Sequence, residues 1–191
     1  MSETYATMPS PVGELLLTAA DGRLTGVYLP GQRRPGHPGT DTPGGYGNSG
    51  SDPGIPGQTL FSRSSISHAA PEGARRDDAG LAAVRTQLEE YFAGSRTSFD
   101  LALAPAGTPF RQVVWEELQR IGYGETTTYA ALAARIGRPS AVRATGAANG
   151  ANPISIIIPC HRVIGSNGSL TGYGGGIDAK RFLLELERSR A

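Results

Sequence analysis

The chain of 191 residues is long enough for one domain or two small ones, and its formal net charge of +1 gives the whole protein no strong bias toward polyanions. A single cysteine excludes an internal disulfide and a multi-cysteine zinc site, and His37, His68 and His161 lack metal-ligand spacing, so we expect no metal. Without a membrane-length apolar run or a signal peptide in residues 1–10, we expect no membrane partner and a reducing, cytoplasmic location.

The N-terminal part begins with two predicted strands. Residues 14–20 and 23–29 have strand-like composition, and Asp21-Gly22 between them is a strong signal for a tight hairpin turn. Residues 31–57 contain nine Gly and five Pro, so more than half of this stretch cannot build a core. We therefore expect a long flexible loop from residue 31 to about residue 76, without regular structure.

Residues 78–104 are predicted to complete the first domain. Apolar residues recur at helical spacing over 78–92, which predicts a helix, and Gly94 follows as a stop signal. Residues 99–103 are predicted to form a short strand. We therefore expect residues 1–104 to form an α/β domain with a small β-sheet, one helix and the long loop.

Residues 105–191 predict a second, mainly helical domain. Three helices are expected first, over 108–121, 128–136 and 141–149. Helix, short break, helix is the pattern of a DNA-binding helix-turn-helix, although many helical hairpins bind nothing. The expected N-capping residues of the three helices are Thr108, Thr127 or Thr128, and Ser140.

The third of these helices is nearly without bulky side chains. Its Ala and Gly residues would let the backbone approach a partner surface closely, and tight packing between helices explains the same composition. Arg143 is its one long side chain. Residues 110–191 carry ten Lys and Arg against six Asp and Glu, whereas residues 1–109 carry eight against eleven, so the second half is basic enough to permit a nucleic-acid partner.

The cysteine follows an apolar run. Residues 154–158 predict a buried strand or extended segment that leads into Pro159-Cys160-His161-Arg162. A lone cysteine in such a place is more often a buried filler than a nucleophile. Neighbours on a regular strand point to opposite faces, but Pro159 favours a turn, in which His161 would act as a base, directly or through a water, and Arg162 would supply positive charge.

The remaining residues predict a turn at 166–168, a Gly-rich loop at 172–176 and an amphipathic helix at 178–188. A histidine that acts as a base is usually oriented by a third group. Glu185 and Glu187 on the last helix are both candidates for this role, and the residue pattern alone does not choose between them.

Residues 152–163, Asn-Pro-Ile-Ser-Ile-Ile-Ile-Pro-Cys-His-Arg-Val, resemble the active-site signature of the bacterial O6-alkylguanine-DNA alkyltransferases, also called methylated-DNA–protein-cysteine methyltransferases. The resemblance covers residues 105–189 and extends to Ser10–Gly13 and the hairpin. Only the predicted loop lies outside it. Further matching segments are Thr108–Trp115, Gly124–Tyr129, Gly137–Arg143 and Thr171–Gly176.

The resemblance implies roles for individual residues. His161 would deprotonate Cys160, the alkyl acceptor, through a water molecule, while Glu187 orients His161 and Asn152 braces the turn. The implied catalytic residues are Cys160, His161, Glu187, Asn152 and Tyr129. The implied substrate-binding residues are Tyr129, Val163, Ser155, Tyr173 and Gly174. The implied DNA-binding residues are Arg143, a finger entering the base stack, with Ala144, Thr128 and Ser140.

The resemblance also implies the reaction and its partners. An alkyl group on O6 of guanine, or on O4 of methylated thymine, would pass irreversibly to Cys160 without a cofactor. The substrate is double-stranded DNA, held from the minor groove with the damaged base flipped out. Neighbouring protein molecules would touch when clustered on DNA.

Three other functions compete with this prediction. Alkyltransferase-like proteins bind alkylated guanine without transferring the group, but they have Trp in place of the nucleophile, so Cys160 argues against them. A thiol hydrolase would use Cys160 and His161 but leaves Tyr129 and Arg143 unexplained. A helix-turn-helix transcription factor would leave residues 159–162 idle.

Overall fold

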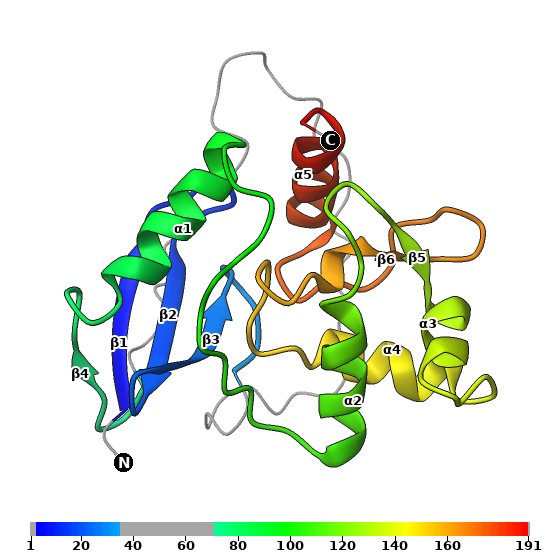
Figure 1. Ribbon diagram of the computed structural model, residues 1–191, viewed down its shortest axis with the longest axis horizontal. Helices are drawn as coiled ribbons and strands as arrows, with labels where there is room; N and C mark the ends of the chain where they lie inside the picture. The colour runs from blue at the N-terminus through cyan, green and yellow to red at the C-terminus, as the bar shows by residue number, and fades with distance from the viewer. Residues whose placement is uncertain (1–2, 35–70, 191) are drawn as a thin grey trace.

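A four-stranded sheet forms the N-terminal part of the computed structural model, which describes residues 3–34 and 71–190 (Figure 1). The strand order is β3-β2-β1-β4, with β2 antiparallel to both β1 and β3, and β4 parallel to β1. The pairing of β1 with β2 aligns Glu3 with Ala20 and Met8 with Leu15. The strands are β1 (Glu3–Met8), β2 (Leu15–Ala20), β3 (Arg23–Tyr28) and β4 (Arg75–Arg76).

The predicted hairpin is confirmed. Asp21 and Gly22 both have positive φ, 50° and 74°, which is the conformation of the two-residue turn whose twist matches antiparallel strands. β1 was not predicted, because it has few apolar residues. Only Ala6 and Met8 of β1 are buried.

The predicted loop over 31–76 is wrong at its C-terminal end, where β4 lies; residues 31–34 contain no helix or strand, and residues 35–70 lie outside the described part of the chain. Gln32 is buried, and its side-chain oxygen accepts a hydrogen bond from the Leu29 amide at 3.2 Å. At the other end, Arg75 and Arg76 pair with β1. Composition could not predict the contacts at these two ends, because Gln32 bonds to Asn152 and Arg75 and Arg76 pair with β1, both far away in the chain.

The predicted strand over 99–103 is also wrong. Only Leu103 forms a bridge, to Leu24 on β3, and the Leu24 amide donates to the Ala102 carbonyl at 2.8 Å. The segment therefore lies extended along β3 without a regular ladder.

The helix predicted for the N-terminal part is confirmed, and it lies across the sheet (Figure 1). This helix, α1 (Ala82–Ala93), begins four residues later than the expected start and ends at Gly94, whose φ of 76° is the left-handed cap conformation. Its Val84, Leu88 and Tyr91 are buried in the core.

Helices dominate the C-terminal part, as predicted. Thr108 and Thr128 cap their helices by accepting from the amides of Arg111 and Ala131. The predicted cap at Ser140 is wrong, since α4 starts later and no side chain caps it. The helices and short strands are α2 (Pro109–Leu118), β5 (Thr127–Thr128), α3 (Tyr129–Arg135), α4 (Val142–Gly150), the 3-10 helix η1 (Cys160–Arg162), β6 (Val163–Ile164) and α5 (Ile177–Arg188).

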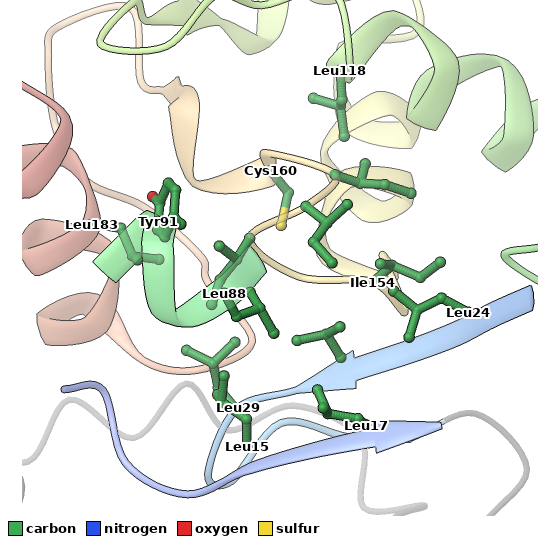
Figure 2. Packing of buried hydrophobic residues seen from close by; sticks show 14 of the residues in the cluster. Leu15, Leu17, Leu24, Leu29, Leu88, Tyr91, Leu118, Ile154, Cys160 and Leu183 are labelled. Carbon is green, nitrogen blue, oxygen red and sulfur yellow. The ribbon is translucent and has the colours of Figure 1, made fainter. Parts of the chain in front are cut away.

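One hydrophobic cluster joins the two parts. Figure 2 shows Leu17 and Leu24 from the sheet, Leu88 from α1, Leu118 from α2, and Ile154 with Cys160 packed together. The backbone continues this contact, because the Val27 amide donates to the Pro153 carbonyl at 2.9 Å and the Ser155 amide to the Val27 carbonyl at 3.1 Å. The segment that carries Cys160 is therefore anchored to the edge strand β3.

The indole of Trp115 on α2 fixes the position of α4. The Trp115 side chain is 1% exposed, and its Nε1 donates to the Ala148 carbonyl at 2.9 Å. No helix within residues 3–34 and 71–190 has both the length and the apolar character needed to cross a membrane.

Candidate functional site

Residues 155–158 form turns and a bend rather than the strand or extended segment predicted over 154–158, although the predicted burial is confirmed. Ile156 has a φ of 73°, which a β-branched residue adopts only under strain, of order 1–3 kcal/mol. The Cys160 amide donates to the Ile158 carbonyl at 2.8 Å, and η1 follows at once. The chain therefore turns at Cys160, as Pro159 indicated.

Cys160 is 3% exposed, and its sulfur is directed into the core (Figure 2). Asn152 Nδ2 donates to Cys160 Sγ at 3.1 Å and to the Ile158 carbonyl at 2.8 Å, while Asn152 Oδ1 accepts from the Ile154 amide at 3.0 Å. Asn149 of α4 donates to the Cys160 carbonyl at 3.3 Å. Asn152 therefore closes the turn around the thiol.

Burial raises the pKa of the Cys160 thiol above 9.0, and the hydrogen bond from Asn152 and the positive charge of Lys180 oppose this rise only in part. The thiol is therefore protonated near neutral pH. A reaction that needs the thiolate requires a base nearby.

His161 and Glu187 form a fully buried pair. His161 Nε2 donates to Glu187 Oε1 at 2.8 Å, because the ionised carboxylate can only accept. The other ring nitrogen, Nδ1, therefore carries the lone pair, and no group within residues 3–34 and 71–190 forms a hydrogen bond with it. Burial lowers the pKa of His161, and Glu187 opposes the fall, so the ring is neutral at pH 7.

Glu187 is the centre of a larger network. Arg162 donates to both of its oxygens at 2.9 Å, Tyr91 donates through its hydroxyl at 2.8 Å, and the Gly124 amide donates at 3.2 Å. Burial raises the pKa of Glu187, but the hydrogen bonds from His161 and Arg162 outweigh burial and hold that pKa well below its usual range. Glu185 is exposed, so the geometry selects Glu187 as the partner of His161.

Lys180, which the sequence analysis did not assign to the site, is fully buried beside it. Its Nζ donates to the carbonyls of Val163 at 2.6 Å and Thr171 at 2.9 Å, and burial lowers the pKa of Lys180 to about 8. The Tyr129 hydroxyl donates to the same Thr171 carbonyl at 3.1 Å. The sequence signal for both Lys180 and Glu187 is their position on the apolar face of the last helix, where a charged side chain needs a buried partner.

The predicted substrate-binding residues other than Tyr129 lie on the two segments beside Cys160. Val163, Ser155 and Tyr173 are buried, and Gly174 is half-buried. Burial raises the pKa of Tyr173 well above 10, so its hydroxyl stays protonated, and nothing in the described part of the chain forms a hydrogen bond with it. The structure therefore brings these four residues together, along with Gln32, which the sequence analysis missed.

The predicted DNA-binding residues lie on or beside α3 and α4. Arg143, Ala144 and Ser140 are exposed, and Thr128 is half-buried. Thr128 uses its oxygen as an acceptor in capping α3, which leaves its hydroxyl proton able to donate. Asn149 of α4 connects the exposed residues of that helix to the buried turn at Cys160, because its side chain donates to the Cys160 carbonyl.

The site has no group of metal ligands. Across the described residues, no three His, Cys, Asp or Glu side chains converge on one point. The chemistry available is that of a buried thiol, a neutral imidazole and a carboxylate.

Comparisons with known proteins identify the family that this chain resembles. Residues 109–189 match the family model described as 6-O-methylguanine DNA methyltransferase, DNA binding domain. A constitutive methylated-DNA–protein-cysteine methyltransferase of Bacillus subtilis (strain 168) is 37% identical over 185 residues, which cover 96% of this chain and 94% of that protein. A methylated-DNA–protein-cysteine methyltransferase of Mycobacterium tuberculosis (strain ATCC 25618 / H37Rv) is 62% identical over 105 residues, 55% of this chain. The chain spans 64% of the length of that relative in this match.

The fold is also similar to that of solved structures. The crystal structure of Mycobacterium tuberculosis OGT in complex with DNA has a TM-score of 0.75 and 41% sequence identity to this chain, covering 98% of this chain and 94% of that one. The similarity therefore includes both the sheet and the helical part.

The Glu187 network leads to a test by substitution. Glu187→Gln removes the negative charge but keeps the side-chain size, and it leaves the buried Arg162 guanidinium uncompensated. We expect the free energy of unfolding at pH 7 to fall by about 3 kcal/mol or more in urea denaturation. The exposed control Glu185→Gln should change it by less than about 0.5 kcal/mol. Equal effects of the two substitutions would contradict the central role of Glu187.

Proposed function

The chain belongs to the methylated-DNA–protein-cysteine methyltransferase family, and from this premise we propose that it repairs DNA by transferring an alkyl group from O6 of guanine to Cys160. The observation that supports this most is the turn in which Asn152 donates to the buried Cys160 thiol and the next residue, His161, pairs with Glu187. Such an arrangement suits a thiol that is protonated at rest and is deprotonated by a nearby base before it attacks.

His161 is the proposed base. The Cys160 thiol has a raised pKa, so it needs a proton acceptor, and the Nδ1 lone pair of the neutral His161 is available for that proton through a water molecule. Glu187 fixes the ring tautomer that leaves Nδ1 unprotonated and stabilises the imidazolium once formed.

The transfer itself breaks one bond and forms one. The thiolate attacks the alkyl carbon, a sulfur–carbon bond forms, and the bond between that carbon and O6 breaks with its electron pair on the base. The base leaves more easily if it receives a proton or a hydrogen bond, and we assign this donor role to the Tyr129 hydroxyl, which would exchange its hydrogen bond to the Thr171 carbonyl for one to the base. The thioether product has no good leaving group, so each molecule reacts once, and the reaction needs no cofactor.

DNA is proposed to dock on α3 and α4 as a helix-turn-helix. The exposed small residues of α4, Ala144 among them, allow a close approach to the minor groove, and Thr128 and Ser140 can donate to phosphates. Arg143 would enter the stack where the damaged base has left, because the alkylated O6 is out of reach inside a duplex.

The pocket residues Val163, Ser155, Tyr173 and Gly174 would hold the flipped base. Because they lie beside Cys160, we propose that they accept O6-alkylguanine and also O4-methylthymine. Gly174 would line the pocket without a side chain.

The proposed organisation has two domains, residues 1–104 and 105–191. Residues 104–108 contain no helix or strand and connect them. DNA contact belongs to the second domain, and neighbouring molecules would touch one another when they cluster on the same duplex.

The central test uses duplex DNA that carries a single O6-methylguanine. We expect a stoichiometric gain of one methyl group on the Cys160 peptide by mass spectrometry, and no gain in Cys160→Ser. Binding of the duplex with Cys160 unmodified would instead identify a recognition protein. Turnover beyond one equivalent would identify a hydrolase-like enzyme.

The role of His161 is tested by the pH dependence of transfer. His161→Gln can still donate to Glu187 but cannot accept a proton, so at pH 7 the rate constant should fall about 100-fold. Since the pKa of Cys160 lies above 9.0, the thiolate fraction of the variant rises with pH up to and beyond pH 9, and the deficit should shrink accordingly. A deficit that stays constant between pH 7 and pH 10 would exclude His161 as the base.

The role of Arg143 is tested with two substrates. Arg143→Ala should slow repair of duplex DNA at least about tenfold while transfer from the free base O6-methylguanine stays nearly unchanged, because only the duplex requires base flipping. Arg181→Ala, an exposed arginine on α5, is the matched control and should leave both rates unchanged. Equal losses on the two substrates in Arg143→Ala would exclude the finger role.

A further inference from the structure

Gln32 from the N-terminal part reaches the turn that carries Cys160. Its side chain is 9% exposed and makes three hydrogen bonds. Nε2 donates to the Asn152 carbonyl at 3.0 Å, and Oε1 accepts from the Leu29 amide at 3.2 Å and from the Ser155 hydroxyl at 2.9 Å. One amide therefore joins the end of β3 to both ends of the segment 152–155.

The polarity of this contact requires a side chain at position 32 that both donates and accepts, as an amide does. The Leu29 N–H can only donate, and the Asn152 carbonyl can only accept, so the bridging side chain must present an acceptor to one and a donor to the other. An ionised carboxylate supplies only acceptors, and an aliphatic side chain supplies neither. A buried polar group left without its partner costs more than an exposed one.

Gln32 also lies against Gly174, another residue of the proposed pocket. A Cβ atom on Gly174 would lie 2.8 Å from Cγ of Gln32 and 3.1 Å from its Cδ, so the glutamine side chain occupies the space beside this glycine. The same side chain therefore contacts both Ser155 and Gly174.

Asn152 makes this contact relevant to the thiol. The carbonyl of Asn152 receives the Gln32 hydrogen bond, while its side chain donates to Cys160 Sγ at 3.1 Å. A shift of the Asn152 backbone would change that second hydrogen bond, which opposes the rise in the pKa of Cys160.

We propose that Gln32 is a positioning residue for alkyl transfer, which holds Asn152 and Ser155 at the distances that keep the Cys160 thiol ready to react. This inference rests on the proposed function, since it assigns Gln32 a part in the same reaction. Gln32 acts through Asn152 and Ser155 and does not touch the thiol.

Gln32→Glu tests the proposal, because a positioning role predicts a rate ratio that depends on pH, whereas a purely structural role does not. When the introduced carboxyl is ionised, it repels the Asn152 carbonyl; when it is protonated, it can donate to that carbonyl as the amide does. Burial raises the pKa of such a carboxyl, which brings its ionisation closer to neutral pH.

The expected result is a change in the ratio of variant to wild-type rate constants for methyl transfer from duplex DNA. The variant should be about tenfold slower at pH 8.5, as judged by the usual effect of one lost hydrogen bond, and should approach wild type as the pH falls toward about 5.5. The titratable groups in and beside the neighbouring segments are Cys160, His161, Tyr173 and Lys180, the last with a pKa lowered by burial to about 8. Titration that the variant and wild type share cancels in the ratio, and Tyr173 stays protonated because its pKa lies well above 10.

Gln87→Glu is the matched control. Gln87 also bridges a backbone donor and acceptor, the amide and carbonyl of Asp100, within the N-terminal part and away from Cys160. Its rate ratio should stay near one at every pH. Gln32→Ala supplies a second variant, which should bind duplex DNA as wild type does and transfer the methyl group about tenfold more slowly at all pH values.

The outcomes separate the two proposals. If the wild-type protein takes up no methyl group on Cys160, the proposed function is wrong and the role of Gln32 falls with it. If the wild type reacts but the Gln32→Glu ratio is the same at every pH, or Gln32→Ala reacts as fast as wild type, only the role of Gln32 is wrong. Rates are expressed per reactive molecule, counted from total methyl uptake, so loss of folded protein does not imitate a slower reaction.

Discussion

The buried carboxylate of Glu187 is the constraint on which the site depends. It lies on α5, yet its hydrogen-bond partners come from α1, from the loop before α3 and from η1. An unpaired charge at a fully buried position would be strongly destabilising, so these elements must all be in place for the carboxylate to be compensated. The same carboxylate determines which nitrogen of His161 keeps its lone pair. Glu187 therefore contributes both to the stability of the fold and to the tautomer of His161.

The turn at Cys160 illustrates how the fold prepares a reactive group. A regular strand would have placed Cys160 and His161 on opposite faces. The positive φ of Ile156 and the side chain of Asn152 replace that strand with turns, at the cost of local backbone strain. The bridge between Val27 and Ile154 ties this strained segment to the sheet. The N-terminal sheet therefore supports the site although it supplies none of the residues proposed to react.

Local signals in the sequence predicted the local features of the fold. The Asp21-Gly22 hairpin, the Thr108 cap and the burial of residues 154–158 depend on near neighbours and were predicted correctly. The choice of Glu187 over Glu185, the anchoring of Gln32 and the pairing of Arg75 with β1 depend on segments far away in the chain. Composition classed Gln32 with the Gly-rich residues that follow it. The resemblance to a family identified Cys160 and His161, but the hydrogen bonds around them required coordinates.

These long-range hydrogen bonds also bear on how the molecule folds. Tyr91 and Glu187 are 96 positions apart in the chain, and Gln32 and Asn152 are 120 apart. Closing such large loops carries an entropic cost that local helices and hairpins avoid, so non-local contacts form slowly. Helices and the β2–β3 hairpin would consequently precede the site, and a chain with much of its secondary structure would still hold an unshielded thiol. Reactivity of Cys160 toward small thiol reagents during refolding would therefore report the last stage of assembly.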